Sequence, residues 1–346
     1  MSAPTLTNPG PAPAGPANPA PAPKGPSPRG LSLRAFAKVT ACQHRWTVVA
    51  ALGVAVVAAA VLLAAVYMSD HATDVLKAAG CVKDTHDPDC YQPAREYFDA
   101  QLFASHLPEY VGLGVILLPA VIAGYMAGPL VARELETGTY KLAWTQSASP
   151  ARWLAAKLAV AAAFTVALMV VVNLAFGWSW PNGSIDDYAG FWYDPTVYAS
   201  LPGTVPVATT LFGVALGAFL GLLIRRTLPA LLTSTLLTGG VILAFVKYRH
   251  LLWPTETLTG QAARHRPTSS WDVELGILTP SGRKVSMADC HWDAACLKQQ
   301  GGVTDYADIH PQSHFWPLQL VETGILLALA ALAVLAAFRV LRSRLP

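Results

Sequence analysis

The chain has 346 residues, and its 24 Lys and Arg residues outnumber its 21 Asp and Glu residues to give a formal net charge of +3. Only 13% of the residues are charged, about half the share in soluble domains, while 53% are hydrophobic. This balance excludes an ordinary water-soluble protein. We therefore expect membrane lipid, and no nucleic acid, as a partner of the chain.

The amino-terminal region differs from the rest in composition. Residues 1–30 are almost entirely Pro, Ala, Gly and Ser, which cannot bury enough apolar surface to offset the entropy of an ordered chain. We predict a disordered tail there and a membrane domain over residues 31–346. Between residues 31 and 45, basic and apolar residues alternate at roughly helical spacing. This pattern predicts either a short helix at the inner membrane surface or a simple basic flank of the first span.

Six apolar blocks follow, each long enough to cross the hydrocarbon layer of about 30 Å as a helix. The first block is too long, and begins too late in the chain, for a cleaved signal peptide. The blocks predict an all-α membrane protein in which residues 69–107, 177–204 and 247–314 form outer loops. The six predicted spans are residues 46–68, 108–130, 153–176, 205–224, 228–246 and 315–338.

The distribution of charge predicts the orientation of the chain. The four segments on one side hold 14 of the 24 Lys and Arg residues but only two acidic residues, Glu134 and Glu136. Basic residues near span ends resist translocation, so this side is expected to be cytoplasmic, with both termini there. These segments are residues 1–45, 131–157, 225–227 and 339–346.

The cysteines agree with this topology. Cys81 and Cys90 share the first outer loop, Cys290 and Cys296 share the last, and Cys42 alone lies inside. An even number of cysteines in an oxidising compartment predicts two loop disulfides, with free thiols as the alternative. A zinc site is a further alternative, but the spacing fits no recognised zinc motif. The histidines that could join the cysteines in such a zinc site are His291, His310 and His314.

Small residues in two spans predict close helix packing. The second span contains Pro119, Pro129 and several glycines, which predict a kinked helix. In the fourth span, Gly213, Gly217 and Gly221 lie on one helical face and allow another helix to approach closely. This face packs either inside one subunit or at a subunit interface.

The loop between the second and third spans contains the most informative motif. A helix that continues from the second span is expected to end near Gly138, and a short helix then carries Tyr140 and Trp144 on one face. Ser149 is expected to cap the third span, with Pro150 at its first helical position. The resulting helix-turn-helix either docks a soluble partner or anchors the loop at the membrane surface.

This loop resembles that of ABC type 2 permeases, the membrane subunits of bacterial ABC exporters. The shared pattern E-x-G-T…L-x-W-T-Q-S…R-W-L-x-x-K runs from Glu136 to Lys157 in this sequence. Residues 225–230 and 315–324 are also similar to segments of that family, although residues 310–314 depart from one variant of it. The resemblance covers residues 31–346.

The resemblance implies a function for this loop. In such permeases it is a cytoplasmic coupling helix that seats in a separate ATPase subunit, and two permease subunits, identical or pseudo-symmetric, form one complex. The implied location is the bacterial plasma membrane. The residues implied to dock or couple the ATPase are Glu134, Glu136, Gly138, Thr139, Tyr140, Trp144, Gln146 and Arg152.

The sequence carries no catalytic signature. It lacks the pattern G-x-x-x-x-G-K-[ST], so ATP and Mg²⁺ are expected on the partner subunit, and this chain is expected to bind no cofactor and to be no enzyme. Two acids, Glu109 and Glu322, lie near the outer ends of spans. Each is expected either to line an outer vestibule or to extend to nearby water.

The combined prediction is a permease subunit that exports an amphipathic or hydrophobic compound, or a lipid, with energy from a separate ATPase. Two other classes fit the same sequence. One is a membrane sensory or immunity protein without transport, and the other is a membrane-embedded enzyme, which would need polar residues that converge at one membrane depth. A neighbouring gene for an ABC ATPase would favour transport.

Overall fold

The computed structural model describes residues 45–82, 87–141, 149–182 and 191–344. The predicted tail of residues 1–30 and the predicted surface helix before Arg45 lie outside this part of the chain. Within the described residues, six helical segments are long and apolar enough to cross a membrane, which confirms the six-span prediction. They are α2 (Arg45–Ala78), α3 to α4 (Tyr91–Ile122, the π-helix η2 of Ala123–Ala127, and Gly128–Thr137), α6 (Pro150–Asn182), α8 (Val205–Ile224), α9 (Thr227–Tyr248) and α12 (Phe315–Arg344).

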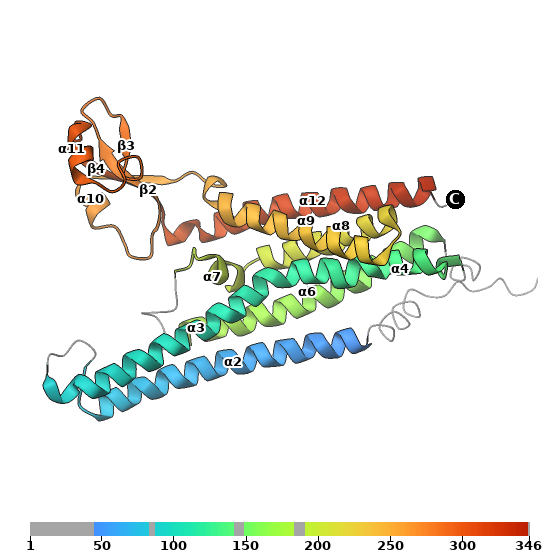
Figure 1. Cartoon of the computed structure of the whole chain (residues 1–346), viewed down its shortest axis with the longest axis horizontal. Coiled ribbons are helices and arrows are strands. Elements are labelled where there is room, and N and C mark those ends of the chain that lie inside the picture. The colour runs from blue at the N-terminus through green and yellow to red at the C-terminus, as the bar shows by residue number, and fades with distance from the viewer. Residues whose placement is uncertain (1–44, 83–86, 142–148, 183–190, 345–346) are drawn as a thin grey trace, which may run out of the picture.

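The connections between these helices gather at two opposite ends of the bundle (Figure 1). One end holds the start of α2, the end of α4, the start of α6, the α8–α9 turn and the end of α12. We call it the α4–α6 end. The opposite end carries the tip between α2 and α3 and a small β-sheet, and we call it the sheet end. The described parts of the segments predicted to lie on one side of the membrane (residues 45, 131–141, 149–157, 225–227 and 339–344) therefore lie at one end of the bundle.

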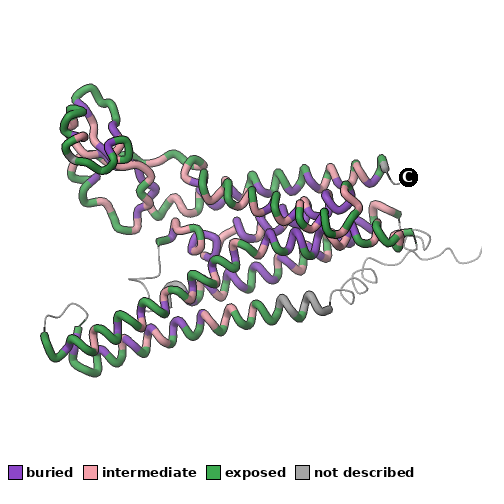
Figure 2. Tube along the Cα trace, in the orientation of Figure 1, coloured by how far each residue is buried: buried purple, intermediate pink, exposed green. Residues whose placement is uncertain are grey.

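Helix α8 is the central helix of the bundle. It packs against α12, α4, α9 and α6, so most of its residues are buried (Figure 2). By contrast, α2 packs mainly against α3 and α6 and exposes apolar side chains such as Val56 and Tyr67. Exposed apolar side chains on a spanning helix are suited to lipid. The core of the protein is therefore the set of contacts around α8.

The glycine face of α8 packs inside the chain. A Cβ atom at Gly217 would lie 2.7 Å from the Ala123 carbonyl oxygen, and one at Gly221 would lie 2.7 Å from the Gly128 carbonyl oxygen. Gly213 meets Pro119 in the same way. The continuous helix formed by α3, η2 and α4 thus covers this face, so of the two predicted arrangements the structure has packing within one subunit.

The second span is interrupted as its proline and glycine content predicts. The π-helical turn η2 follows Pro119, whose missing N–H removes one bond from the helical ladder. On the side away from α8, Gly124 and Gly128 meet the backbone and side chains of α9 around Ala230 and Thr235. This span is therefore held between two neighbouring helices.

Residues 69–107, which were predicted to be an outer loop, are mostly helical in the structure. Helix α2 continues to Ala78, and η1 (Pro88–Cys90) leads directly into α3. The extension is stable because the buried Gln101 side chain accepts a bond from Ser69 Oγ at 2.9 Å and donates one to the Ser69 carbonyl. A disulfide between Cys81 and Cys90 closes the tip.

The outer loop of residues 177–204 also contains more helix than the span boundaries suggest. Helix α6 continues to Asn182, and the short helix α7 (Pro195–Ser200) lies beside α3 and α8. Asp194 and Pro195 begin α7, a position at which the missing N–H of proline costs little. Helix α7 brings Tyr198 into the core at the sheet end.

The segment between α9 and α12 forms a small β-containing unit, which we call the cap (residues 249–314). It was predicted to be an outer loop, so its antiparallel sheet, in the order β1-β4-β2-β3, is an addition to the all-helical prediction. Its elements are η3 (Arg249–Leu251), β1 (Glu256–Thr259), α10 (Gln261–Arg264), β2 (Trp271–Leu278), β3 (Lys284–Ser286), α11 (Ala294–Gln299), β4 (Thr304–His310) and η4 (Gln312–His314).

The two faces of the cap sheet have different chemistry. On one face, Ala307, Ile309 and Leu275 pack with Ala263 of α10. On the other face, Glu274 of β2 lies opposite Asp308 of β4. The alternation of apolar and polar residues along β2 and β4 thus gives the sheet one packed face and one polar face.

Candidate functional site

The α4–α6 end brings together the residues predicted to contact a partner. Helix α4 ends at Thr137, and Gly138 adopts the left-handed conformation (φ 74°) that ends a helix without a Cβ penalty. Helix α6 begins at Pro150, and Ser149 Oγ accepts a bond from the Arg152 backbone N–H at 3.3 Å. The predicted helix stop and helix cap are therefore both present in the structure.

Glu134 joins α4 to α6. Its carboxylate accepts a bond from Lys157 Nζ at 2.6 Å and another from Trp153 Nε1 at 3.0 Å. The side chains of Lys157 and Glu134 are only 8% and 23% exposed, so this ion pair is shielded from water. Trp153 and Leu154 are buried beside Val131 and Leu222 in one apolar cluster. Glu134 therefore fixes the base of the loop rather than presenting its charge to a partner.

Glu136 joins α4 to the α8–α9 turn. Its Oε2 atom accepts bonds from the Thr227 backbone N–H at 2.9 Å and from Thr227 Oγ1 at 2.6 Å. This carboxylate therefore caps the first turn of α9, where backbone N–H groups lack helical partners. Arg225 closes α8 with a positive φ of 58°, which makes the turn between α8 and α9 short. Movement at the end of α4 would thus reach α9 through one side chain.

The remaining predicted docking residues have varied positions. Thr139 and Arg152 are exposed, and Thr139 Oγ1 bonds to Thr137 Oγ1. Tyr140 is half-buried against the apolar cluster around Trp153. Trp144 and Gln146 lie outside the described residues. Among the described residues of this loop, the exposed ones lie at the turn around Gly138 and at the start of α6.

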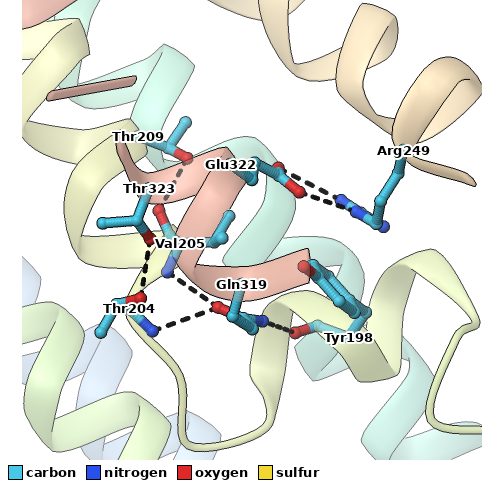
Figure 3. A network of polar contacts seen from close by, with 8 residues as sticks. All are labelled: Tyr198, Thr204, Val205, Thr209, Arg249, Gln319, Glu322 and Thr323. Carbon is cyan, nitrogen blue, oxygen red and sulfur yellow. Dashed lines mark hydrogen bonds and ion pairs between the residues drawn. The ribbon is translucent and has the colours of Figure 1, made fainter. Parts of the chain in front are cut away.

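The sheet end contains a buried ion pair that the sequence did not predict (Figure 3). Arg249 Nε donates to Glu322 Oε2 at 2.8 Å, and both side chains are less than 5% exposed. The guanidinium group lies over the ring of Tyr198, 3.7 Å from its centroid. Three separate elements, η3, α12 and α7, meet at this point. Such a pair resists disruption, because the loss of one partner would leave a buried charge uncompensated.

Gln319 extends this network to the start of α8. Its Oε1 atom accepts bonds from the backbone N–H groups of Thr204 and Val205 at 3.1 and 3.0 Å, and its Nε2 atom donates to the Tyr198 carbonyl at 3.2 Å. Thr323 bonds to the Thr204 hydroxyl at 2.7 Å. One face of α12 therefore ties α7 to the start of α8 (Figure 3).

The two acids predicted near the outer ends of spans have different surroundings. Glu322 is buried in the network described above and does not extend to water. Glu109 is exposed on α3 and bonds to His106 at 3.2 Å. The signal that could have identified the ion pair is Arg249, which follows the fifth span directly and matches the depth of Glu322 at the start of the sixth.

A narrow cleft of about 30 Å³ adjoins this ion pair. It lies between α3, α7, α8 and α9, and its lining is apolar except for Thr209, Arg249 and Glu322. This volume is enough for a water molecule but not for a larger compound. In this conformation the sheet end of the bundle is therefore closed around the ion pair.

The four cysteines of the first and last predicted outer loops form two disulfides. Cys290 and Cys296 are joined by a disulfide, as are Cys81 and Cys90. Among the residues that the structure describes, no group of three or more His, Cys, Asp and Glu side chains is placed to hold a metal ion. His310 bonds instead to His314, with their Nδ1 atoms 3.0 Å apart, and to the His250 carbonyl. Burial lowers the pKa of His310.

Comparison with known proteins gives one match. The model of a family described as ABC-2 membrane transporter related matches residues 51–249, from the first turns of α2 to the end of α9. Most of the cap and all of α12 lie beyond the matched region. No curated protein and no solved structure matches the chain.

Proposed function

The chain belongs to the family of ABC-2 membrane transporter related proteins, and from this premise we propose that it is the membrane-spanning permease subunit of an ATP-driven exporter. Membership makes the chain a multi-pass transporter permease that associates with an ABC ATPase. The outward direction of transport, the substrate and the place where the ATPase docks are parts of the proposal.

The proposed docking site is the exposed surface of the α4–α6 end, around Thr139 and Arg152. Its position supports this assignment, because the loop extends from two spanning helices that are joined at their base by Glu134. A force that a partner applies to the loop would therefore pass to both of these helices. In this proposal the α4–α6 end faces the cytoplasm, both termini lie there, and the membrane is the plasma membrane of a bacterium.

The proposed coupling route runs through two carboxylates. Glu134 links the end of α4 to α6, and Glu136 links it to the first turn of α9. Displacement of the loop would therefore move α6 and α9 together. Because α8 lies between these helices, the movement would reach the centre of the bundle and then the ion pair at the sheet end.

The proposed cargo is an amphipathic or hydrophobic compound or a lipid. The apolar surfaces of the spanning helices and the apolar lining near Arg249 support this choice. ATP and Mg²⁺ would bind to the partner ATPase, and two permease subunits, alike or related by pseudo-symmetry, would complete the transporter. Family membership favours this function over the sensory protein, immunity protein and enzyme alternatives.

Co-purification of the chain with its partner ABC ATPase tests the docking site. Arg152→Glu reverses an exposed charge at the start of α6 and should weaken ATPase binding by about tenfold or more. Deletion of residues 138–147, which keeps both bracing glutamates, should abolish it. An intact complex after the deletion would refute the proposed site.

The matched control is Arg342→Glu, the same charge reversal on an exposed residue of α12 at the same end of the bundle. It should leave the complex intact, because α12 lies outside the proposed contact. Equal losses for the two charge reversals would mean that net charge, and not the loop, holds the ATPase.

A further inference from the structure

A second, larger cleft lies in the cap, between the η3–β1 connection and the polar face of the sheet. Its volume is about 350 Å³, within the range of small-molecule sites. Leu252, Trp253 and Pro254 line one side, while Glu274 and Asp308 line the other. The cleft thus combines an apolar and aromatic wall with an acidic wall, and it belongs neither to the proposed docking site nor to the ion pair of the bundle.

Of the two carboxylates on the acidic wall, only one has a basic partner. Glu274 and Asp308 lie directly opposite each other on adjacent strands, an arrangement that is unfavourable for like charges. Asp308 is compensated, because Lys284 Nζ lies 2.5 and 2.7 Å from its two carboxylate oxygens and Thr257 also donates to it. In the part of the chain that the structure describes, Glu274 forms no ion pair with Lys, Arg or His.

The negative charge of Glu274 also affects its neighbourhood. The Tyr306 ring is buried, and this burial, followed by the nearby Glu274 carboxylate, raises the pKa of the Tyr306 hydroxyl. The same ring lies 4.9 Å from Lys284 Nζ. Lys284 is thus held between Asp308 and Tyr306, on the side of Asp308. Glu274 is thus a half-buried carboxylate with no ion-pair partner among the described residues, in a cleft whose lining also includes His250.

The opposite wall favours an organic cation over a metal ion. Trp253, a residue that is 38% exposed, lines the cleft, and an indole ring attracts an ammonium group most strongly when water is partly excluded. Calcium, in contrast, takes six to eight oxygen ligands, whereas this cleft offers one uncompensated carboxylate. Leu252 and Val273 add apolar surface suited to alkyl substituents.

We propose that the cap cleft is a binding site for an organic ammonium group, with Glu274 as its counter-ion and Trp253 as its aromatic wall. The ammonium group belongs either to a free compound or to the headgroup of a lipid, since the cleft begins at the end of spanning helix α9. The site stands independently of the proposed transport function, because it needs neither an ATPase nor a direction of transport.

Calorimetric titration of the full chain with choline tests this site. The chain is placed in nanodiscs of phosphatidylglycerol, whose headgroup has no ammonium group. Choline should bind, while its uncharged isostere 3,3-dimethylbutan-1-ol and calcium chloride should not. No choline binding, or equal binding of the uncharged isostere, would overturn the proposal. Stronger binding of calcium than of choline would also overturn it.

Variants separate the two walls. Glu274→Gln should weaken choline binding by at least about tenfold, because it removes the counter-ion. Trp253→Leu should weaken it by about three- to thirtyfold through loss of the aromatic face. Glu274→Asp keeps the charge and should retain most of the affinity, which guards against a simple folding defect. The control Glu256→Gln neutralises an exposed acid outside the lining and should change nothing.

The source of the ammonium group follows from a second titration in nanodiscs of phosphatidylcholine. A weaker apparent affinity for choline in these discs supports occupation by the lipid headgroup. An unchanged affinity supports a free ammonium compound. If Glu274→Gln binds choline as tightly as the original chain in both lipids, Glu274 is not the counter-ion and the assignment fails.

Discussion

The two ends of the helical bundle are held together in different ways. At the sheet end, a buried ion pair, the Gln319 network and two disulfides join the elements, and Arg249 and Glu322 are almost fully shielded from water. At the α4–α6 end, two glutamates of α4 provide the ties, and Glu136 is exposed. Exposed ties cost less to break than buried ones. The tie from Glu136 to α9 should thus break at lower cost than the ties of the sheet end, while the shielded Glu134–Lys157 pair keeps α4 joined to α6.

The largest effect is expected for the ion pair. Arg249→Ala should lower the free energy of unfolding by about 3–5 kcal/mol, because Glu322 would be left buried without its partner. Thermal unfolding in detergent measures this loss. The double variant Arg249→Met/Glu322→Leu should cost much less than the single variant. If both proteins were equally unstable, packing of the side chains, and not their charges, would hold this end together.

The centre of the bundle, between the two ends, is expected to tolerate no added volume on the glycine face. Gly217→Ala should cost about 1–3 kcal/mol, because its new Cβ atom would lie 2.7 Å from the backbone oxygen of Ala123. Gly240→Ala on α9 is the matched control, since no atom lies within 4 Å of that position. Equal melting temperatures for the two variants would contradict close packing of α8 against the second span.

A smaller loss of stability is expected at the α4–α6 end. Glu136→Ala removes the two hydrogen bonds to the first turn of α9 and should lower the melting temperature by less than Gly217→Ala does. It should nevertheless uncouple the ATPase, so that transport falls while the complex stays assembled. Measurement of ATP hydrolysis and transport in proteoliposomes checks this expectation. Glu109→Ala removes an exposed acid of α3 at the sheet end and should leave both rates unchanged; a loss of coupling there would count against the route through Glu136.

The smallest effect concerns pH at the sheet end. Burial lowers the pKa of His310 below its unfolded value of about 6.5, so the neutral form is favoured in the folded cap. Its contribution to stability is therefore present above that unfolded value and is lost as the pH falls through the lower folded pKa. The protection factors of residues 304–314 against hydrogen exchange, which correct for the slower intrinsic exchange in acid, should fall on acidification, and His310→Gln should reduce this fall. An unchanged pH response in the variant would assign it to another group.

The sequence predicted the helical part of this fold well because apolar length alone decides which segments span a membrane. The Gly138 stop, the Ser149 cap and the glycine face of α8 were also predictable, since each depends on local chemistry. The helical extension of α2 and α3 was missed because its polar residues suggested a loop. Its stability comes from Gln101, which bonds to Ser69 across 32 positions in the chain.

The sheet and the ion pair were harder to predict because both depend on distant contacts. Strand β2 does show an alternating pattern, with Trp271, Val273 and Leu275 between acidic residues, and this pattern was a usable signal. Its pairing with β4 gave no such signal. Arg249 and Glu322 are 73 positions apart, so only their similar depth in the membrane could have linked them.

The central claim is that the α4–α6 end faces the cytoplasm, where an ATPase can reach it. Thr139→Cys, in a chain whose Cys42 is replaced by serine, is treated in sealed cells with a maleimide that cannot cross membranes. Thr268→Cys in the exposed part of the cap serves as the reference. Thr268→Cys should be labelled in intact cells, and Thr139→Cys only after permeabilisation. Labelling of Thr139→Cys in intact cells would contradict the account.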